Sequence, residues 1–280
     1  MNKRRSFIFP TIIGTTIFYF IPLLMTFAYS MMKRKTKEVG VQNYIDLLND
    51  KLFLLSFRHT MLFAIASIVV IVILGLVCAS AMVEMSGVKQ IVIFIVITQT
   101  AVMPSGLASY LWKILFSNSG FINRCLVASG LQVVDFNTGI AAWISLLILF
   151  VWKYIAYSFC LYVFALKRIP VEYHEVARME TSSWWQIFTK VTWQCLKPVT
   201  VLVILITSIN VYKIYKEMYL IWGAYPSSDI YMLQHYFSNE FRIMNVDKMC
   251  TAAIFIILLS LLIICATAKL LEKINEKENI

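Results

Sequence analysis

Charge is scarce in this 280-residue sequence. Asp, Glu, Lys and Arg make up only 14% of it, whereas 60% is hydrophobic and the mean hydropathy is +0.76. Soluble domains typically contain about 25% charged and about 45–50% apolar residues. The shortage of charge excludes a water-soluble globule, and the hydrophobic excess excludes an intrinsically disordered chain. The composition therefore predicts a polytopic membrane protein.

The motifs of catalytic and metal-binding proteins are also missing. The six cysteines form no C-x-x-C pair and most lie in apolar runs, so we expect neither a disulfide framework nor a metal site. The three histidines lie in separate segments, and no G-x-x-x-x-G-K-S/T phosphate loop occurs. We therefore expect no catalytic residues and no cofactor in this chain.

Long uncharged runs are abundant. A helix needs about 20 apolar residues to cross a hydrocarbon core of about 30 Å, and lipid offers no partner to unpaired backbone groups, so such runs must be helical. The sequence predicts an all-α membrane protein that forms a single domain, 1–280. Its six transmembrane helices are expected at 7–32, 61–83, 91–112, 139–166, 199–222 and 249–268.

The orientation in the membrane is harder to predict. Lys3, Arg4 and Arg5 precede the first run as in a signal peptide, but 26 uncharged residues exceed the usual 7–15, so we expect a retained helix. The basic residues behind the net charge of +10 lie beside apolar runs, where lipid headgroups attract them, so lipid and not nucleic acid is their expected partner. They are divided evenly between the two sides, and the cluster 33–37 argues against a cytoplasmic N-terminus. An even number of spans places both termini on one side.

The longest polar segment, about 167–198, connects the fourth and fifth spans. Pro170 suits the first position of a helix, and Glu172 and Glu175 suit the first turn, where the helix dipole favours carboxylates. The segment is charged and amphipathic, which favours a surface that a cytoplasmic partner binds.

A turn is expected to divide this segment into two helices. The run Thr181-Ser182-Ser183 ends the first helix, and Ser183 and Gln186 have capping-box spacing for a second. Pro198 is expected to end that second helix. The segment therefore predicts a helix-turn-helix loop.

This loop resembles the coupling (EAA) loop of ABC importer permeases, whose signature is roughly E-A-A-x-x-x-G followed by I-x-L-P. The chain reads E-V-A-R-M-E-T at 175–181 and L-K-P at 196–198, after the lead-in I-P-V-E-Y at 169–173. Ala177 keeps the second Ala of the motif, whereas Thr181 replaces its Gly.

Other matches resemble the sugar branch of the family and its maltose-F-like first permease subunit. They are N-Y at 43–44, Pro104, the W…F…G…N pattern at 112–123, W-K at 152–153, Y-K-I-Y-K-E-M-Y at 212–219 and W-G-A-Y-P at 222–226. The matches follow one another in family order along nearly the whole chain. The family Asp of the fifth span is replaced by Lys216.

The resemblance implies a type I ABC importer permease in a bacterial cell membrane, with both termini and the coupling loop in the cytoplasm. The implied partners are a second homologous permease, two ATPase subunits that hold ATP and Mg, and an extracytoplasmic solute-binding protein. The implied solute is a carbohydrate, more specifically an oligosaccharide, moved by alternating access. Glycerol-3-phosphate or another polar solute is the alternative, and a polytopic membrane enzyme or a channel is a more distant one.

The resemblance also implies a coupling surface on the loop. It would consist of Glu172, Glu175, Ala177, Glu180 and Thr181, with Glu175 as the polar anchor in a groove of the ATPase subunit. The alternative is that Glu175 only satisfies N–H groups in the first turn of its helix.

A substrate path is expected near the middle of the membrane. Lys153 lies at the centre of its span, where a charge costs about 2.5–3.5 kcal/mol and must face protein or water. It would bind solute hydroxyls or, alternatively, pair with a carbonyl or carboxylate in this subunit or its partner. Gln99 and Asn210 are expected at a similar depth.

Aromatic residues extend this candidate path along the fifth span. Their spacing of 3, 4 and 3 places Tyr212, Tyr215, Tyr219 and Trp222 on one helix face. Such a face can bind the C–H face of a sugar ring, although packing or an interfacial belt gives the same pattern. Glu217 is expected in the path as well, partly neutralised by Lys213 four residues earlier.

Overall fold

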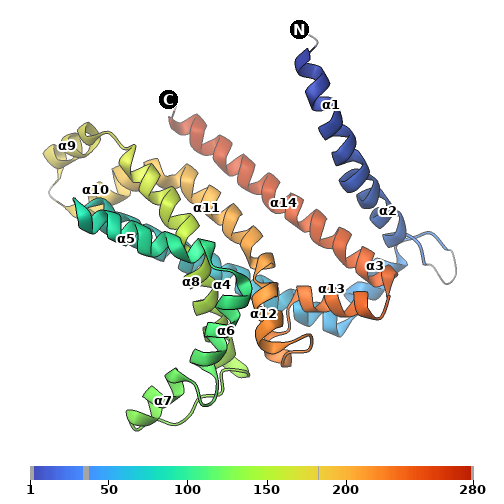
Figure 1. The fold of residues 1–280 in the computed structure, drawn as a ribbon. Helices are drawn as coiled ribbons and strands as arrows, with labels where there is room; N and C mark the ends of the chain where they lie inside the picture. The colour runs from blue at the N-terminus through green and yellow to red at the C-terminus, as the bar shows by residue number, and fades with distance from the viewer. Residues whose placement is uncertain (1–2, 34–37, 182, 279–280) are drawn as a thin grey trace. The chain divides into compact units, whose positions relative to one another are not determined.

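The computed structural model of the chain describes residues 3–33, 38–181 and 183–278. Positions 34–37 of the basic cluster 33–37 lie outside these ranges, and so does Ser182 of the predicted turn. The regular elements of the described part are all helices, as predicted (Figure 1). The helices form two compact units, Met1–Phe57 with Leu233–Cys265 and Arg58–Met232 with Ala266–Ile280, called unit 1 and unit 2 below.

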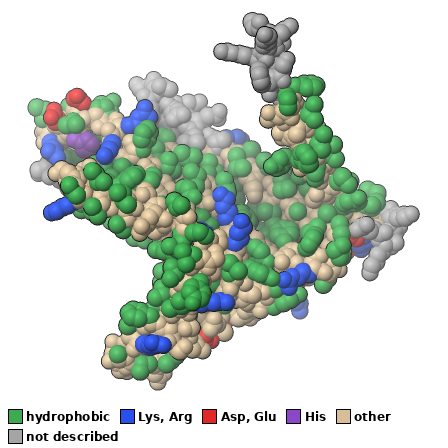
Figure 2. All heavy atoms as spheres, viewed as in Figure 1, with side chains coloured by type: hydrophobic (Ala, Val, Ile, Leu, Met, Phe, Trp, Pro, Cys, Tyr) green, Lys and Arg blue, Asp and Glu red, His purple; other side chains and the backbone are tan. Residues whose placement is uncertain are grey.

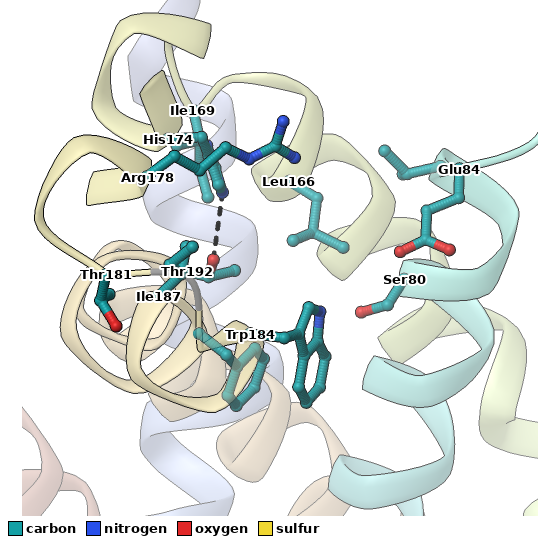
Figure 3. Close-up of a pocket in the computed structure, with 12 residues that line it drawn as sticks. Ser80, Glu84, Leu166, Ile169, His174, Arg178, Thr181, Trp184, Ile187 and Thr192 are labelled. Carbon is teal, nitrogen blue, oxygen red and sulfur yellow. Dashed lines mark hydrogen bonds between the residues drawn. The ribbon is translucent and has the colours of Figure 1, made fainter. Parts of the chain in front are cut away.

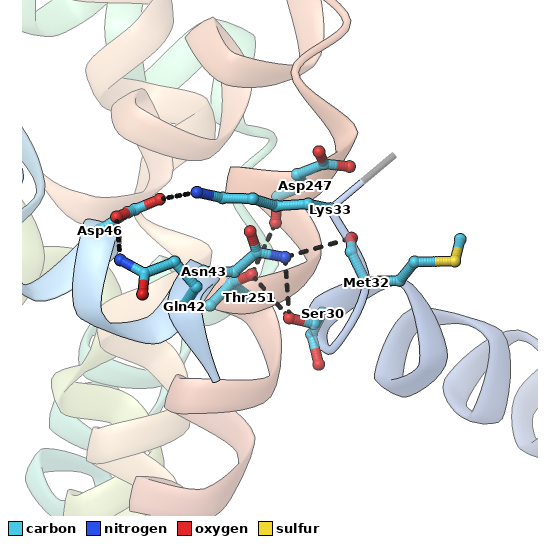
Figure 4. A network of polar contacts seen from close by, with 8 residues as sticks. All are labelled: Ser30, Met32, Lys33, Gln42, Asn43, Asp46, Asp247 and Thr251. Atoms are coloured by element: carbon cyan, nitrogen blue, oxygen red, sulfur yellow. Dashed lines mark hydrogen bonds and ion pairs between the residues drawn. The ribbon is translucent and has the colours of Figure 1, made fainter. Parts of the chain in front are cut away.

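Unit 1 contains the first span and most of the last one. Its helices are α1 (Lys3–Thr15), the π-helical turn η1 (Thr16–Phe20), α2 (Ile21–Ser30), α3 (Gln42–Leu48), the start of α4 (Lys51–Val83), α13 (Leu233–Arg242) and most of α14 (Val246–Glu278). The elements that meet at the end of α2 are connected by polar side chains (Figure 4).

The buried side chain of Asn43 is central to these contacts. Its amide donates hydrogen bonds to the backbone carbonyls of Ser30 (3.1 Å) and Met32 (3.2 Å). Thr251, in α14, donates to the same Ser30 carbonyl over 3.4 Å. A buried amide that is satisfied in this way stabilises one arrangement of α2, α3 and α14.

Unit 2 holds the middle four predicted spans and the predicted coupling loop. Its helices are most of α4, α5 (Val88–Thr98), η2 (Gln99–Val102), α6 (Ser105–Phe116), α7 (Phe121–Ala128), α8 (Gly139–Lys167), α9 (Val171–Glu180), α10 (Trp184–Ile187), η3 (Phe188–Thr192), α11 (Trp193–Lys213), α12 (Tyr215–Trp222) and η4 (Ser228–Ile230). The central helix is α8, which packs against α5, η2 and α11.

Two kinds of residue let α8 occupy the core. Leu149, Phe150 and Phe159 are completely buried, so that the helix contributes large apolar side chains to the main hydrophobic cluster. Gly75 of α4 faces Ser158, where a Cβ would lie only 2.3 Å from the hydroxyl oxygen. The two helices therefore approach this closely because residue 75 has no side chain.

Five described segments are long and apolar enough to cross a membrane. They are Phe9–Ser30, Lys51–Val83, Gly139–Lys167, Trp184–Trp222 and Val246–Thr267. A sixth span is obtained if Val88–Val102 and Ser105–Ala128, which are bent by 103° at their junction, cross together. The segments agree in position with the six predicted spans.

The prediction of one continuous helix over 91–112 was wrong, because the chain breaks between η2 and α6. Met103 is extended there, with ψ of 126°, and Pro104 follows it. The pyrrolidine ring of a proline disfavours a helical conformation in the residue before it and removes one backbone donor. Pro104 therefore favours the break at this position.

Two predictions for the ends of the loop helices were also wrong. Ser183 makes no capping hydrogen bond, and Thr181 donates its hydroxyl to Gln186 over 2.7 Å and accepts from the Ser183 N–H over 3.2 Å. Pro198 does not end a helix but lies inside α11. A proline removes only one helical hydrogen bond, and the apolar run after it has no alternative to a helix in lipid.

Candidate functional site

The predicted coupling loop is a folded unit at one end of α8. Helix α9 begins at Val171, directly after Pro170, and Thr181 follows its last residue. Figure 2 shows acidic, basic and histidine side chains gathered around α9, whereas hydrophobic side chains cover the lengths of the helices. The loop therefore differs in chemistry from the apolar spans that carry it.

A cavity of about 610 Å³ lies behind the loop, with α9 on one side and the end of α4 on the other (Figure 3). His174 of α9 is hydrogen-bonded through Nε2 to the hydroxyl of Thr192 in η3 over 3.2 Å. Arg178 and Glu84 line opposite sides of the cavity. The hydrogen bond connects both arms of the loop, so that α9 is held as part of unit 2.

The five predicted coupling residues all lie on α9 or at its end. Glu172, Glu175 and Glu180 are exposed, and Ala177 and Thr181 are half-buried. Glu175 is the fifth residue of α9, and its side chain makes no hydrogen bond or ion pair with any described residue. Its position beyond the first turn and its lack of a partner disfavour the alternative in which it satisfies helix N–H groups.

Apolar side chains accompany these carboxylates on the loop. Met179 is 89% exposed and Val176 59% in α9, and Trp184 and Trp185 are 66% and 64% exposed in α10. Large apolar side chains that gather at the surface of a polar segment mark a site of protein contact. We call Glu175, Val176, Met179, Trp184 and Trp185 the loop face.

The structure brings Lys153 and Glu217 together as an ion pair inside unit 2. The Glu217 side chain in α12 is fully buried, and the Lys153 ammonium in α8 also donates to the Ser105 hydroxyl of α6 over 3.0 Å. Three helices therefore meet at one charged contact. Of the two interpretations of Lys153, this geometry favours pairing with a carboxylate of its own subunit.

Lys213 is not the partner of Glu217, contrary to the prediction. Lys213 is exposed and makes no ion pair within the described part of the chain. A fully buried carboxylate needs a partner that is buried with it, which an exposed lysine at the end of α11 cannot supply. Ser105 was missed, and the only signal for it was a hydroxyl directly after Pro104 within an apolar run.

The aromatic stripe is interrupted by a turn at Ile214, between α11 and α12. Tyr215 and Tyr219 remain neighbours, with ring centroids 5.8 Å apart. Tyr212 and Trp222 are half-buried. The interruption is small, because the Ile214 N–H still donates to the carbonyl of residue 210, four positions earlier.

The polar cluster expected at mid-membrane depth does not form in the described structure. Asn210 is buried in α11, whereas Gln99 of η2 is exposed, and no hydrogen bond joins the two side chains. Lys153 is paired elsewhere. The residues of the predicted path therefore divide into the buried pair of Lys153 with Glu217, the separately buried Asn210, and aromatic side chains of α11 and α12 that are half-buried or, at Tyr219, exposed.

No family model matches the chain, but several known proteins that resemble it are permeases of sugar transport systems. It is 26% identical over 226 residues to a trehalose/maltose transport system permease of Thermococcus litoralis, covering 78% of this chain and 76% of the relative. A lactose transport system permease of Rhizobium radiobacter is 23% identical and covers 90% and 88% of the two chains. An arabinooligosaccharides transport system permease of Halalkalibacterium halodurans is 24% identical and covers 93% and 84%.

Solved structures show the same fold. A bacterial ABC transporter involved in the import of the acidic polysaccharide alginate has a chain that matches with a TM-score of 0.84 at 18% identity, covering 96% of this chain and 94% of that one. The expected resemblance is thus confirmed by sequence and by fold. The chain is a multi-pass membrane protein that resembles the non-catalytic permease subunits of sugar ABC transport systems.

Proposed function

We propose that the chain is the permease subunit of an ATP-driven importer that moves a carbohydrate through a bacterial cell membrane by alternating access. Three relatives are permeases of systems for trehalose and maltose, lactose, and arabinooligosaccharides, which supports a carbohydrate solute. A structural neighbour of 19% identity and TM-score 0.80 was solved with an alginate pentasaccharide-bound periplasmic protein. These solutes support an oligosaccharide as the cargo.

The observation that carries the proposal is the loop face. It combines an unpaired carboxylate with exposed Met179, Trp184 and Trp185 in a loop between two apolar spans. Such a surface suits a groove on another protein, and Glu175 would supply the charge-assisted anchor. ATP and Mg would be held by two such partner subunits, whose closure pulls on α9.

The remaining partners follow from the same proposal. A second homologous permease would close the path from the opposite side, and an extracytoplasmic solute-binding protein would deliver the sugar. The negative charge of Glu217 already neutralises the positive charge of Lys153. The pair therefore offers no free positive charge to an anionic solute such as glycerol-3-phosphate. A neutral sugar fits this pair better than an anion does.

The proposal is tested by purifying the chain from native membranes with its bound subunits and reconstituting the complex in proteoliposomes. We expect two ATPase chains and a second permease to copurify. Uptake of maltose, trehalose, lactose or arabinotriose should require both ATP and the solute-binding protein. Uptake that proceeds without ATP would contradict the proposed mechanism.

The orientation gives a separate prediction. With the loop and both termini in the cytoplasm, a cysteine introduced by Gln186→Cys should resist an impermeant maleimide in whole cells. One introduced by Ser228→Cys, in η4 of the connection between α12 and α13, should react. The measurement uses a background without the six native cysteines. Reaction at position 186 from outside the cell, with none at 228, would invert the topology.

We propose that the solute passes the side chains of Lys153, Asn210, Tyr212, Tyr215, Glu217, Tyr219 and Trp222. Tyr212→Leu and Tyr215→Leu keep the apolar bulk and remove a hydroxyl, so we expect slower uptake and a changed preference among sugars of different length. A site whose polar groups lose their partner discriminates less well. If both variants, at wild-type membrane levels, keep rate and preference, the stripe only packs. The control is Tyr110→Leu, which changes an exposed tyrosine outside the proposed path. We expect sugar uptake by this variant to equal that of the wild type.

A further inference from the structure

A second hollow lies at the other end of α8 from the loop face, within unit 2, where α6 and α12 end (Figure 1). Its volume is about 440 Å³, within the range of about 300–1,000 Å³ typical of small-molecule sites. Four of the residues that line it are aromatic, namely Trp112, Phe116, Phe136 and Trp222. We call it the outer hollow.

The aromatic walls of the outer hollow are arranged in a fixed way. Trp112 and Phe116 lie one turn apart on α6, with their rings stacked at a centroid distance of 4.7 Å and an interplanar angle of 26°. Phe136 stands edge-on to Phe116 at 5.0 Å. Packed rings of this kind offer a rigid apolar surface, and little conformational entropy is lost when a ligand covers it.

The backbone around the hollow is equally fixed. The buried Asn123 side chain donates to the carbonyls of Ser117 (3.1 Å) and Val134 (2.9 Å) and accepts from the Val134 N–H (2.9 Å). Gly120 is required in this turn, because a Cβ would lie 2.5 Å from a backbone oxygen. Gly223, with φ of 79°, ends α12 directly after Trp222. The hollow is therefore formed by the fold itself.

One accessible polar side chain of the hollow has no partner within the described chain. The exposed Asn118 side chain, which lines the hollow, makes no hydrogen bond there, and its amide can both donate to and accept from a ligand. The indole nitrogens of Trp112 and Trp222 are buried away from the hollow, so these two side chains contribute apolar ring surface to it. Apolar ring faces next to an amide match a sugar, which has C–H faces and a hydroxyl rim.

We propose that the outer hollow is a carbohydrate subsite that holds one sugar ring before the solute reaches Tyr215 and Tyr219. The inference rests on the proposed function, because it takes the cargo and the orientation from it. Trp222 connects the two regions, since it follows Tyr219 by three residues on the same helix. The ring lies between Trp222 and Phe136, and its hydroxyl groups bond to the Asn118 amide.

The test uses the complete transporter in nanodiscs, without the solute-binding protein, and a chain without its six native cysteines. Ser119→Cys places a thiol at the edge of the hollow. The control chain keeps only the native Cys125, which is exposed on α7 and does not line the hollow. The rate of maleimide reaction is measured with maltose, trehalose, lactose and arabinotriose. Wild-type uptake of each sugar is measured in parallel in proteoliposomes with ATP and the solute-binding protein.

We expect a sugar that the transporter takes up to slow the reaction of the Ser119→Cys thiol and to leave Cys125 unaffected. Trp222→Leu should raise the sugar concentration for half-protection about tenfold, because one aromatic wall is lost. Trp222→Phe keeps the wall and should raise that concentration less.

Each contrary outcome has a distinct meaning. Uptake of a sugar without protection of the Ser119→Cys thiol overturns the subsite and leaves the proposed function intact. Absence of uptake for all four sugars, in the presence of ATP and the binding protein, overturns the carbohydrate proposal and the subsite with it. In a separate measurement with the solute-binding protein added and no sugar, protection of the Ser119→Cys thiol overturns the subsite, because a protein loop then fills the hollow.

Discussion

Lys153→Met is expected to destabilise the permease by about 3–5 kcal/mol, because it leaves the fully buried Glu217 carboxylate without a charged partner. Glu217→Leu should cost a similar amount, since the Lys153 ammonium then keeps only the Ser105 hydroxyl. The measurement is the thermal unfolding of the purified transporter in detergent. Lys213→Met, which removes an exposed charge on α11, is the matched control and should change stability by less than about 0.5 kcal/mol.

The double variant Lys153→Met with Glu217→Leu separates the two interpretations of Lys153. A buried ion pair replaced by apolar side chains of similar volume is often close to neutral in stability. We therefore expect most of the lost stability to return in the double variant. If uptake returns with it, the pair is a connection between α8 and α12. Restored stability without uptake would instead assign Lys153 or Glu217 to the solute.

A double variant destabilised by the sum of the two single variants would contradict the pairing itself. In that case each side chain would contribute through packing alone. The comparison is informative because the two residues are 64 positions apart in the chain and contact each other directly. Their coupling energy can therefore be assigned to one contact, as a double-mutant cycle requires.

The long-range contact at Lys153 marks a limit of what the sequence could predict. The cost of a charge in lipid required that Lys153 face protein or water, and this part of the prediction needed only the length of its span. The identity of the partner depended on how α8 and α12 pack. A periodicity rule compares residues within one helix, so it selected Lys213 for Glu217 and missed the pair across helices.

The helical spans were predictable because lipid leaves so few alternatives. Every long uncharged run of the sequence corresponds to a helix or, at Pro104, to a pair of helices. The bend of 103° could not be predicted, because a proline in a membrane can either kink a helix or divide it. The outcome depends on contacts such as those of Ser105 with Lys153, which only the folded structure supplies.

In the coupling loop, too, some features could be predicted from the sequence and others could not. Its two helices and its exposed carboxylates were predictable from local spacing and charge. The hydrogen bonds of the turn were not, because Ser183 precedes α10 without capping it, and the Thr181 hydroxyl makes the contacts with Gln186 and with the Ser183 N–H. Thr181 also stands where the family has Gly, so this turn is closed by side-chain hydrogen bonds and not by a glycine conformation.

Glu175→Ala is expected to weaken the association of the ATPase subunit at least tenfold without affecting insertion of the permease. The lost charge-assisted hydrogen bond is worth about 1.5–3 kcal/mol, and Glu175 has no partner within the described chain that would be left unpaired. The folded state should therefore tolerate the change. The measurement is the amount of ATPase that copurifies, together with ATP-dependent uptake at matched membrane levels.

Two further variants show whether the effect comes from the loop face. Glu84→Ala removes another exposed carboxylate, one at the end of α4 and not on the loop face, and should leave association unchanged. Glu175→Gln keeps a hydrogen-bonding group without the charge and should fall between Glu175→Ala and wild type, since charge-assisted bonds are about twice as strong as neutral ones. Normal ATPase copurification and normal uptake in Glu175→Ala would exclude Glu175 as the anchor. The apolar side chains of Met179, Trp184 and Trp185 would then have to carry the association by themselves.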